Sequence, residues 1–358
     1  MRRPPTHRGS TLALSALLLP ALAACGGSGS GSGDKKERKA DPKVRAAEKL
    51  VIYSGRDEKL IAPIVAKLEK ATNTKVEIHY GDSAELADRI LKEGHRTRAG
   101  LFFSQDAGAL GALSRAGMLA ELPRTSLEKV DSAFRGSGGD WIGVSGRSRV
   151  IAYDSRQTDA APDSVKELTG PKWKGKVGYA PTNASFQSFV TGMRVLEGDR
   201  TTLKWLKDLK ANGARPYGKN DAILSGVESG EIALGLINHY YWYEQHAAIE
   251  ARGGKVHSKI HFLPGGDPGA LINTAGVGVL KDGGQNAAAG RAVDYLLGKE
   301  AQKYFAGKTK EYPLAEGVTS PVKDLLPSLK SLDAPKIDLG RLDSLKKTQE
   351  MLKEAGMV

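Results

Sequence analysis

The chain has 358 residues, enough for a sizeable core, and it carries a formal net charge of +12 and a single cysteine, Cys25. One cysteine excludes disulfides within this chain and metal clusters held by several thiolates. Its lysines and arginines are dispersed among 41 acidic residues, and no basic stretch alternates with aromatic residues. We therefore expect a solvated basic surface and no nucleic-acid partner.

Residues 1–24 have the pattern of a signal peptide. Three arginines precede an apolar stretch at residues 11–24, which is too short to cross a bilayer as a stable helix. The stretch ends in small residues before a cysteine, Leu22-Ala23-Ala24-Cys25, and so resembles the lipobox of bacterial lipoproteins. We expect acyl chains on Cys25, and an ordinary secretory signal followed by a stray cysteine is the alternative.

A linker is expected next, at residues 25–48. Gly26–Gly33 contains only glycine and serine, which is typical of a flexible tether, and the following stretch to Lys49 is highly charged. No later segment approaches 18 consecutive apolar residues. The pattern predicts a globular domain held by a lipid anchor on the extracytoplasmic face of the cell membrane.

Apolar strands alternate with amphipathic helices in the first part of the globular region. We expect strands at residues 50–54, 75–80 and 101–103, and helices at residues 60–72, 84–93 and 107–116. This β-α-β-α-β order favours a mostly parallel sheet with helices on both faces.

A second α/β unit follows. We expect strands at residues 141–153, 176–179, 232–237 and 275–280, and helices at residues 186–196, 201–210 and 287–297. The late strands are expected to return to the first lobe. Two α/β lobes joined by strand crossovers form a hinged clamp, with the ligand in the cleft between them.

Two segments match enzyme motifs only in part. Residues 170–176 match the glycines and lysine of a phosphate-binding loop, but Val177 follows where serine or threonine must hold magnesium. The segment Gly143-Val144-Ser145-Gly146 lacks the spacing of a nucleophile elbow. We expect a protein that is not an enzyme, because a phosphate-ester hydrolase needs a nucleophile and base that the sequence does not identify.

An aromatic cluster, Asn238-His239-Tyr240-Tyr241-Trp242-Tyr243, has two interpretations. One is aromatic packing at the start of a helix. The other is metal binding, because phenolate oxygen is a hard anionic donor suited to Fe(III). Adjacent tyrosines on a regular strand point to opposite faces, so both reach one metal only from a loop or a helix N-terminus.

The segment 236–243 resembles the double-tyrosine motif of the bacterial periplasmic ferric-ion-binding proteins, the iron(III) receptors of ABC importers. The resemblance extends from about residue 50 to the C-terminus. Further matching segments occur in the same order, at residues 51–55, 141–150, 173–179, 217–220 and 267–271.

The resemblance implies a two-lobed periplasmic-binding-protein clamp of the second type, each lobe a mostly parallel sheet flanked by helices. Its N-lobe is expected at residues 49–146 with a return at about 273–320, and its C-lobe at residues 147–272 with C-terminal helices at about 321–358. The implied function is that of a monomeric solute-binding protein that delivers Fe(III) to the permease and ATPase of an ABC importer. The alternative is a binding protein for a small oxyanion such as phosphonate or sulfate.

The resemblance also implies metal ligands. Tyr240 and Tyr241 match the family's two phenolates. Asp57 stands where well-known members have histidine, and Gln105, beside Asp106, stands where they have glutamate. The summed charge is kept, so Asp57 is a candidate oxygen ligand and Gln105 a weaker one. Asp57 as a simple cap of the following helix remains equally open.

Family members complete the iron coordination with a synergistic anion, phosphate or carbonate. The residues that match their anion pocket are Asn183, Ala184, Ser185, Asn220 and Asn238. The first three precede an expected helix, whose N-terminal N–H groups suit an anion. Arg147 matches an arginine near the cleft, and binds either the anion bidentately or a structural carboxylate.

Overall fold

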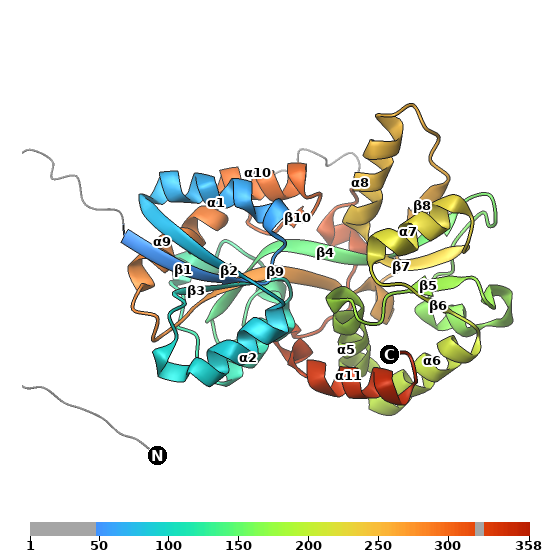
Figure 1. Ribbon diagram of the computed structural model, residues 1–358, viewed down its shortest axis with the longest axis horizontal. Helices are drawn as coiled ribbons and strands as arrows, with labels where there is room; N and C mark the ends of the chain where they lie inside the picture. Colours follow the sequence, from blue (N-terminus) through green and yellow to red (C-terminus); the bar gives the residue numbers. More distant parts are fainter. Residues whose placement is uncertain (1–47, 319–325) are drawn as a thin grey trace, which may run out of the picture. The chain divides into compact units, whose positions relative to one another are not determined.

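The computed structural model describes residues 48–318 and 326–358 (Figure 1). The expected signal peptide, the lipidation of Cys25 and the linker up to residue 47 lie outside the described residues. Within the described ranges, no helix combines the length and the apolar character needed to cross a membrane.

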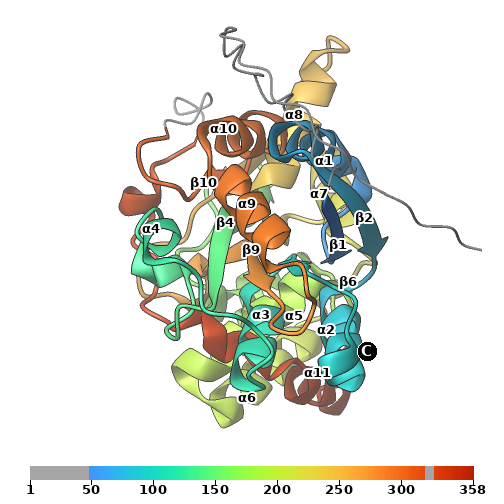
Figure 2. The same ribbon diagram turned by 90° about the vertical axis from the view of Figure 1, so that its left-hand side faces the viewer.

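The N-lobe contains the first three strands and the late strands that return to them. Its strands are β1 Glu48–Ser54, β2 Thr74–Tyr80, β3 Leu101–Ser104, β9 Ile272–Val279, β10 Tyr312–Pro313 and the first half of β4 Trp141–Asp154. Its helices are α1 Glu58–Thr72, α2 Ser83–Glu93, α3 Ala107–Arg115, α4 Arg124–Leu127, α9 Asn286–Leu296 and α10 Lys299–Lys308. Figure 2 shows α1, α9 and α10 on one side of this sheet and α2 and α3 on the other.

Both faces of the N-lobe sheet are buried. Leu50 and Ile52 of β1 pack with α1 and α9, whereas Val51 and Tyr53 pack with α2 and α3. Successive side chains of a strand point to opposite faces, so a strand covered on both sides must be apolar throughout. This is why the sequence of β1 is a continuous apolar run.

The C-lobe repeats this construction. Its strands are β5 Val177–Tyr179, β6 Arg215–Pro216, β7 Leu234–Asn238, β8 Ser258–His261 and the second half of β4. Its helices are α5 Ala184–Glu197, α6 Asp199–Ala211, α7 Asn220–Ser229, α8 His239–Glu250 and α11 Leu345–Glu354. Leu234 and Leu236 pack with α5 and α6, and Ile237 packs with α7 on the opposite face.

Strands β4 and β9 connect the lobes. The strand order β2-β1-β3-β9-β4-β7-β5-β6 runs through both sheets. Residues 141–148 of β4 pair with β9, and residues 149–154 pair with β7 and β8. The β1–β2, β1–β3, β5–β6 and β5–β7 pairs are parallel, and the pairs made by β4 and β9 are antiparallel.

The C-terminal segment packs against both lobes. The short 3-10 helix Leu339–Asp343 lies on α3, where a Cβ on Gly111 would come 2.1 Å from the carbonyl oxygen of Gly340. Helix α11 packs on α5, and Thr191 and Thr348 share a hydrogen bond of 2.7 Å. Only glycine at position 111 permits so close an approach of the backbone.

The expected α/β two-lobed clamp is confirmed, and every strand and helix predicted from the sequence is present within a few residues of its predicted bounds. The return of the late strands is seen in the pairing of β9 with β3. Residues 170–176 form a turn before β5, with Gly175 at a φ of +71°, as expected of a chance match to a phosphate-binding loop. The exact lobe boundaries stay a prediction, because β4 runs unbroken from one sheet into the other.

Candidate functional site

A cavity of about 770 Å³ lies between the lobes. On the N-lobe side it is lined by the loops that follow β1, β2 and β3, and on the C-lobe side by the N-terminal ends of α5, α7 and α8. Parallel strands deliver their carboxyl ends, and the helix N-termini that follow, to the same edge of a sheet. Asp57, Asp82, Asp106 and Asn183 cap four of these helices.

The tyrosine pair sits on the first turn of α8, directly after β7. The two rings face each other, with centroids 4.3 Å apart and planes inclined by 30°, and both line the cavity. Tyr240 is buried, and burial, together with the nearby Tyr241, raises the pKa of its phenol well above 10. The start of the helix therefore brings two adjacent phenols to one wall of the cavity, and the raised pKa keeps Tyr240 protonated at neutral pH.

Asp57 and Gln105 line the opposite wall, and each already has a structural contact. The Oδ1 atom of Asp57 accepts a hydrogen bond of 2.8 Å from the backbone N–H of Lys59, which caps α1. The Oε1 atom of Gln105 accepts one of 2.9 Å from Nη1 of Arg56. Asp57 is thus a helix cap that also faces the cavity.

The predicted anion-pocket residues come together at the N-terminus of α5. The Oδ1 atom of Asn183 accepts hydrogen bonds from the backbone N–H and the hydroxyl of Ser185, at 3.0 and 2.6 Å. Asn220 does not itself line the cavity; its amide donates to the side chains of Asn183 and Ser185 from behind, at 3.3 and 3.0 Å. Ala184 and Asn238 complete this wall.

Arg149 is the residue that the sequence analysis missed. Its side chain is buried but lines the cavity, and its Nη1 donates to Ser185 and Asn238 at 3.1 and 3.2 Å. Within the described ranges its Nε and Nη2 have no hydrogen-bond partner and no carboxylate pairs with it, although the guanidinium lies over the Phe189 ring. Burial lowers its pKa to about 10, which still leaves the guanidinium charged at neutral pH. The alternation Arg147-Ser148-Arg149 on one strand was the available signal, because it places both arginines on the same face.

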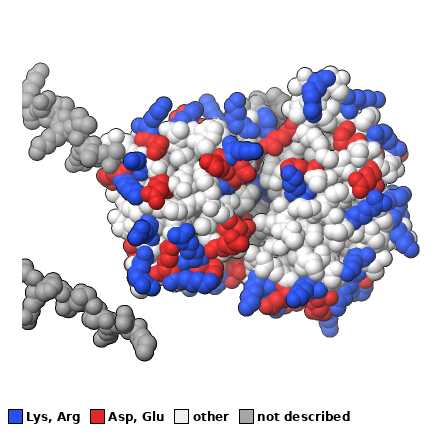
Figure 3. All heavy atoms as spheres, viewed as in Figure 1, with Lys and Arg blue, Asp and Glu red and all other residues white. Residues whose placement is uncertain are grey.

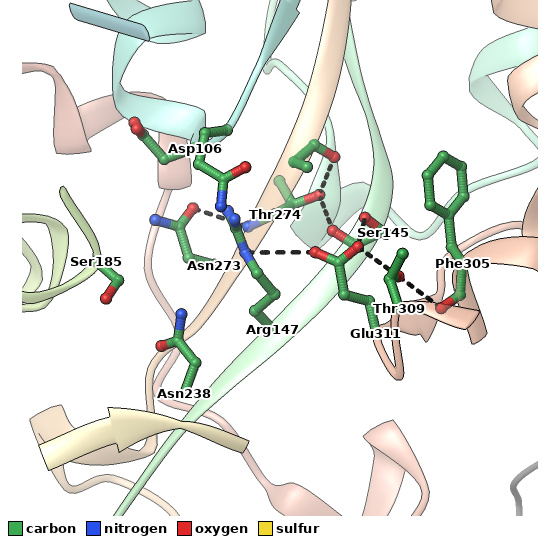
Figure 4. A network of polar contacts seen from close by, with 12 residues as sticks. Asp106, Ser145, Arg147, Ser185, Asn238, Asn273, Thr274, Phe305, Thr309 and Glu311 are labelled. Carbon is green, nitrogen blue, oxygen red and sulfur yellow. Dashed lines mark hydrogen bonds and ion pairs between the residues drawn. The ribbon is translucent and has the colours of Figure 1, made fainter. Parts of the chain in front are cut away.

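Arg147 occupies an intermediate position. It lines the cavity, and its Nε lies 3.9 Å from Glu311, so its pairing with that carboxylate is loose (Figure 4). Glu311 is bound more tightly by Arg56, through hydrogen bonds of 3.0 and 2.7 Å. Burial alone raises the pKa of Glu311, but Arg56 and Arg147 outweigh it and leave that pKa below its usual value. Both roles foreseen for Arg147, anion contact and structural pairing, are thus open to it.

Carboxylates line both sides of the cavity. On the N-lobe side these are Asp57, Glu58, Asp82 and Asp106, and on the C-lobe side Asp221 and Glu244. Acidic side chains flank the hollow between the lobes in Figure 3. Loss of hydration, aided by Asp221 and Glu311, raises the pKa of Glu244 to about 7. Among the described residues, no group of three or more His, Cys, Asp or Glu is placed to hold a metal ion.

Comparison with known proteins gives concordant matches. The bacterial extracellular solute-binding protein family matches residues 97–338. The major ferric iron-binding protein of Neisseria meningitidis is 35% identical over 317 residues, covering 86% of this chain and 93% of that protein. Among solved structures, iron-bound HitA from Pseudomonas aeruginosa superposes with a TM-score of 0.78 at 31% identity, over 86% of this chain and 99% of that chain. A Trichodesmium protein in complex with iron and citrate gives 0.72 at 25% identity, over 86% and 99%.

Proposed function

Because this chain belongs to the bacterial extracellular solute-binding proteins, and because similar proteins are named for ferric iron, we propose that it captures Fe(III) between its lobes for import. The observation that carries the proposal is the placement of Tyr240 and Tyr241 side by side on the first turn of α8, facing one cavity. Two phenolates are hard anionic ligands, which Fe(III) prefers over neutral nitrogen or sulfur.

Capture begins at the phenols. Fe(III) displaces the proton of each phenol, since a bound trivalent cation stabilises the phenolate far more than a proton does at neutral pH. A small anion, phosphate or carbonate, then fills the remaining positions from the N-terminus of α5. Arg149 and Ser185 offer it a guanidinium and a hydroxyl, and closure of the lobes brings Asp57 and Gln105 toward the same ion.

An oxyanion alone is the competing cargo. Arg149, with two donor atoms lacking a partner among the described residues, favours it. A bare anion, however, has no use for two anionic phenolates, and the protonated phenols could serve it only as hydrogen-bond donors. Ferric iron with an anion accounts for both the tyrosine pair and the Arg149 group. Phosphonate or sulfate accounts only for the Arg149 group.

Titration with ferric citrate, followed by visible absorbance, tests the proposal. The wild-type protein is expected to develop a phenolate-to-iron charge-transfer band at one equivalent, and Tyr241→Phe to lose it. Tyr80→Phe is the matched control, because Tyr80 also lines the cavity but lies on the other wall. The proposal fails if wild type stays colourless, or if Tyr241→Phe titrates like wild type.

Outside the cytoplasm, the protein is proposed to be held at the membrane by acyl chains on Cys25 and to pass its cargo to the permease and ATPase of an ABC importer. The sequence Leu22-Ala23-Ala24-Cys25 and the extracellular character of the family support this. In cells, Cys25→Ser is expected to move the protein from the membrane fraction to the soluble fraction without changing ferric binding. An equal membrane fraction for both proteins contradicts the anchor.

A further inference from the structure

The two metal ligands predicted on the N-lobe wall are weak ligands for a trivalent cation. Gln105 is a neutral amide whose oxygen already accepts from Arg56, and one carboxylate oxygen of Asp57 is engaged in capping α1. If iron relied on these groups alone, the two phenolates would leave one positive charge of Fe(III) to be met by a distant wall. This raises the question of which other anionic oxygen is near the phenols.

Glu244 is placed to meet that need. It follows Tyr241 by three residues and Tyr240 by four on α8, a spacing that puts all three side chains on one face of the helix. All three line the same cavity. Side chains on a helix lean toward its N-terminus, which is the direction from Glu244 to the turn that carries the tyrosines.

The charges around Glu244 also favour a cation. In the part of the chain that the structure describes, its carboxylate makes no ion pair or hydrogen bond, and its strongest charged neighbours are Asp221 and Glu311. Lys310 offsets them only in part. Asp221 and Glu311 each have a cationic partner, at 3.7 and 2.7 Å, whereas Glu244 has none among the described residues. The Glu244 carboxylate is therefore available to a cation that enters the cavity.

We propose that Glu244 is a third anionic ligand of the ferric ion, so that α8 alone supplies two phenolates and a carboxylate. Three negative charges on one helix balance Fe(III) before the lobes close. The N-lobe wall and the anion at Arg149 then complete the coordination and exclude water. This inference rests on the proposed function, because it assumes that Tyr240 and Tyr241 bind iron.

The test compares Glu244→Gln with Glu58→Gln. Both variants remove one carboxylate from the same cavity, and neither side chain belongs to the hydrophobic core, so the folds should be preserved. Thermal unfolding of each variant without iron checks this. Citrate competition then measures ferric affinity, and the visible spectrum reports the ligands.

Glu244→Gln is expected to lose at least about tenfold in ferric affinity, with the charge-transfer band shifted to longer wavelength, because a neutral ligand makes the iron a stronger electron acceptor. Glu58→Gln is expected to keep the wild-type band. An unchanged band in Glu244→Gln overturns the inference, even if affinity falls, because the carboxylate would then act only through its charge.

These outcomes separate the inference from the proposed function. A wild-type protein that develops no band with iron removes the proposed function and this inference together. A wild-type band that Tyr241→Phe abolishes and Glu244→Gln leaves unchanged removes only the role of Glu244.

Discussion

The buried arginines on the two walls of the cavity differ in whether they are paired with a carboxylate. On the N-lobe side Arg56 is locked to Glu311 by two short hydrogen bonds. On the C-lobe side the Arg149 guanidinium donates to a hydroxyl and an amide and lies over the Phe189 ring, and no carboxylate among the described residues pairs with it. A buried charge with a full partner is part of the scaffold, whereas one without is poised for a ligand. The N-lobe wall therefore supports the fold, and the C-lobe wall offers a free guanidinium to a ligand.

The largest effect on stability is expected at Glu311. Glu311→Gln leaves Arg56 and Arg147 buried without their counter-charge, and should lower the free energy of unfolding by about 3–5 kcal/mol. Urea denaturation of the protein without iron measures it. Glu128→Gln, which breaks an exposed pair with Arg124, is the control and should cost less than about 1 kcal/mol. Equal losses in the two variants contradict a supporting role for this wall.

The next largest effect is expected in the pH dependence of ferric binding by the C-lobe wall. A free phenol has a pKa near 10, and burial raises that of Tyr240 further, so the unliganded state holds protons that the iron-bound state lacks. Binding must therefore strengthen as pH rises, by up to about a hundredfold per pH unit if two phenols ionise. A pH-stat at pH 8, where the Glu244 carboxyl is mostly ionised, should register about two protons released per ferric ion, after subtraction of a protein-free blank. Release of none is incompatible with phenolate ligation.

Arg149 itself should matter for the anion. Arg149→Gln keeps a donor near Ser185 but removes the charge, and should weaken ferric binding at fixed phosphate by roughly 10- to 100-fold, the size of a charge-assisted hydrogen bond. Arg252→Gln removes an equal charge from the exposed turn after α8 and should change nothing. If the two variants bind alike, Arg149 is as structural as Arg56.

The smallest effect is expected at Asp57. Asparagine also caps helices well, so Asp57→Asn should unfold within about 0.5 kcal/mol of wild type. With the cap preserved, any change in ferric affinity reports ligation alone, and we expect a fall of less than about tenfold. If Asp57→Asn loses as much ferric affinity as Tyr241→Phe, the C-lobe wall is not the main source of iron ligands.

The sequence predicts the parts of this site that depend on local order. Strands at residues 50–54 and 232–237 are recognisable because both faces are buried, and the tyrosine pair follows directly after the second of them. The segment Asn183-Ala184-Ser185 is recognisable as a helix start. Each of these features is set by residues adjacent in the chain.

The ion-pair partners of the buried arginines could not be predicted from residues adjacent in the chain. Glu311 lies 255 residues from Arg56, and no local pattern specifies which of the acidic residues the arginine meets. For the same reason the sequence does not distinguish Arg147 from Arg149. Their alternation places both side chains toward the cavity, but it does not specify which of the two pairs with a carboxylate. Tertiary pairing decides that, and with it which arginine remains available to a ligand.

The proposed function depends most on the binding of iron by the phenolates of α8. Resonance Raman spectroscopy of the iron-loaded protein, excited in its visible band, observes those ligands directly. Wild type should show enhanced ring modes of iron-bound tyrosinate, and the Tyr240→Phe/Tyr241→Phe double variant should show neither the band nor the modes. A wild-type band without tyrosinate modes, or a double variant that keeps both, contradicts the account.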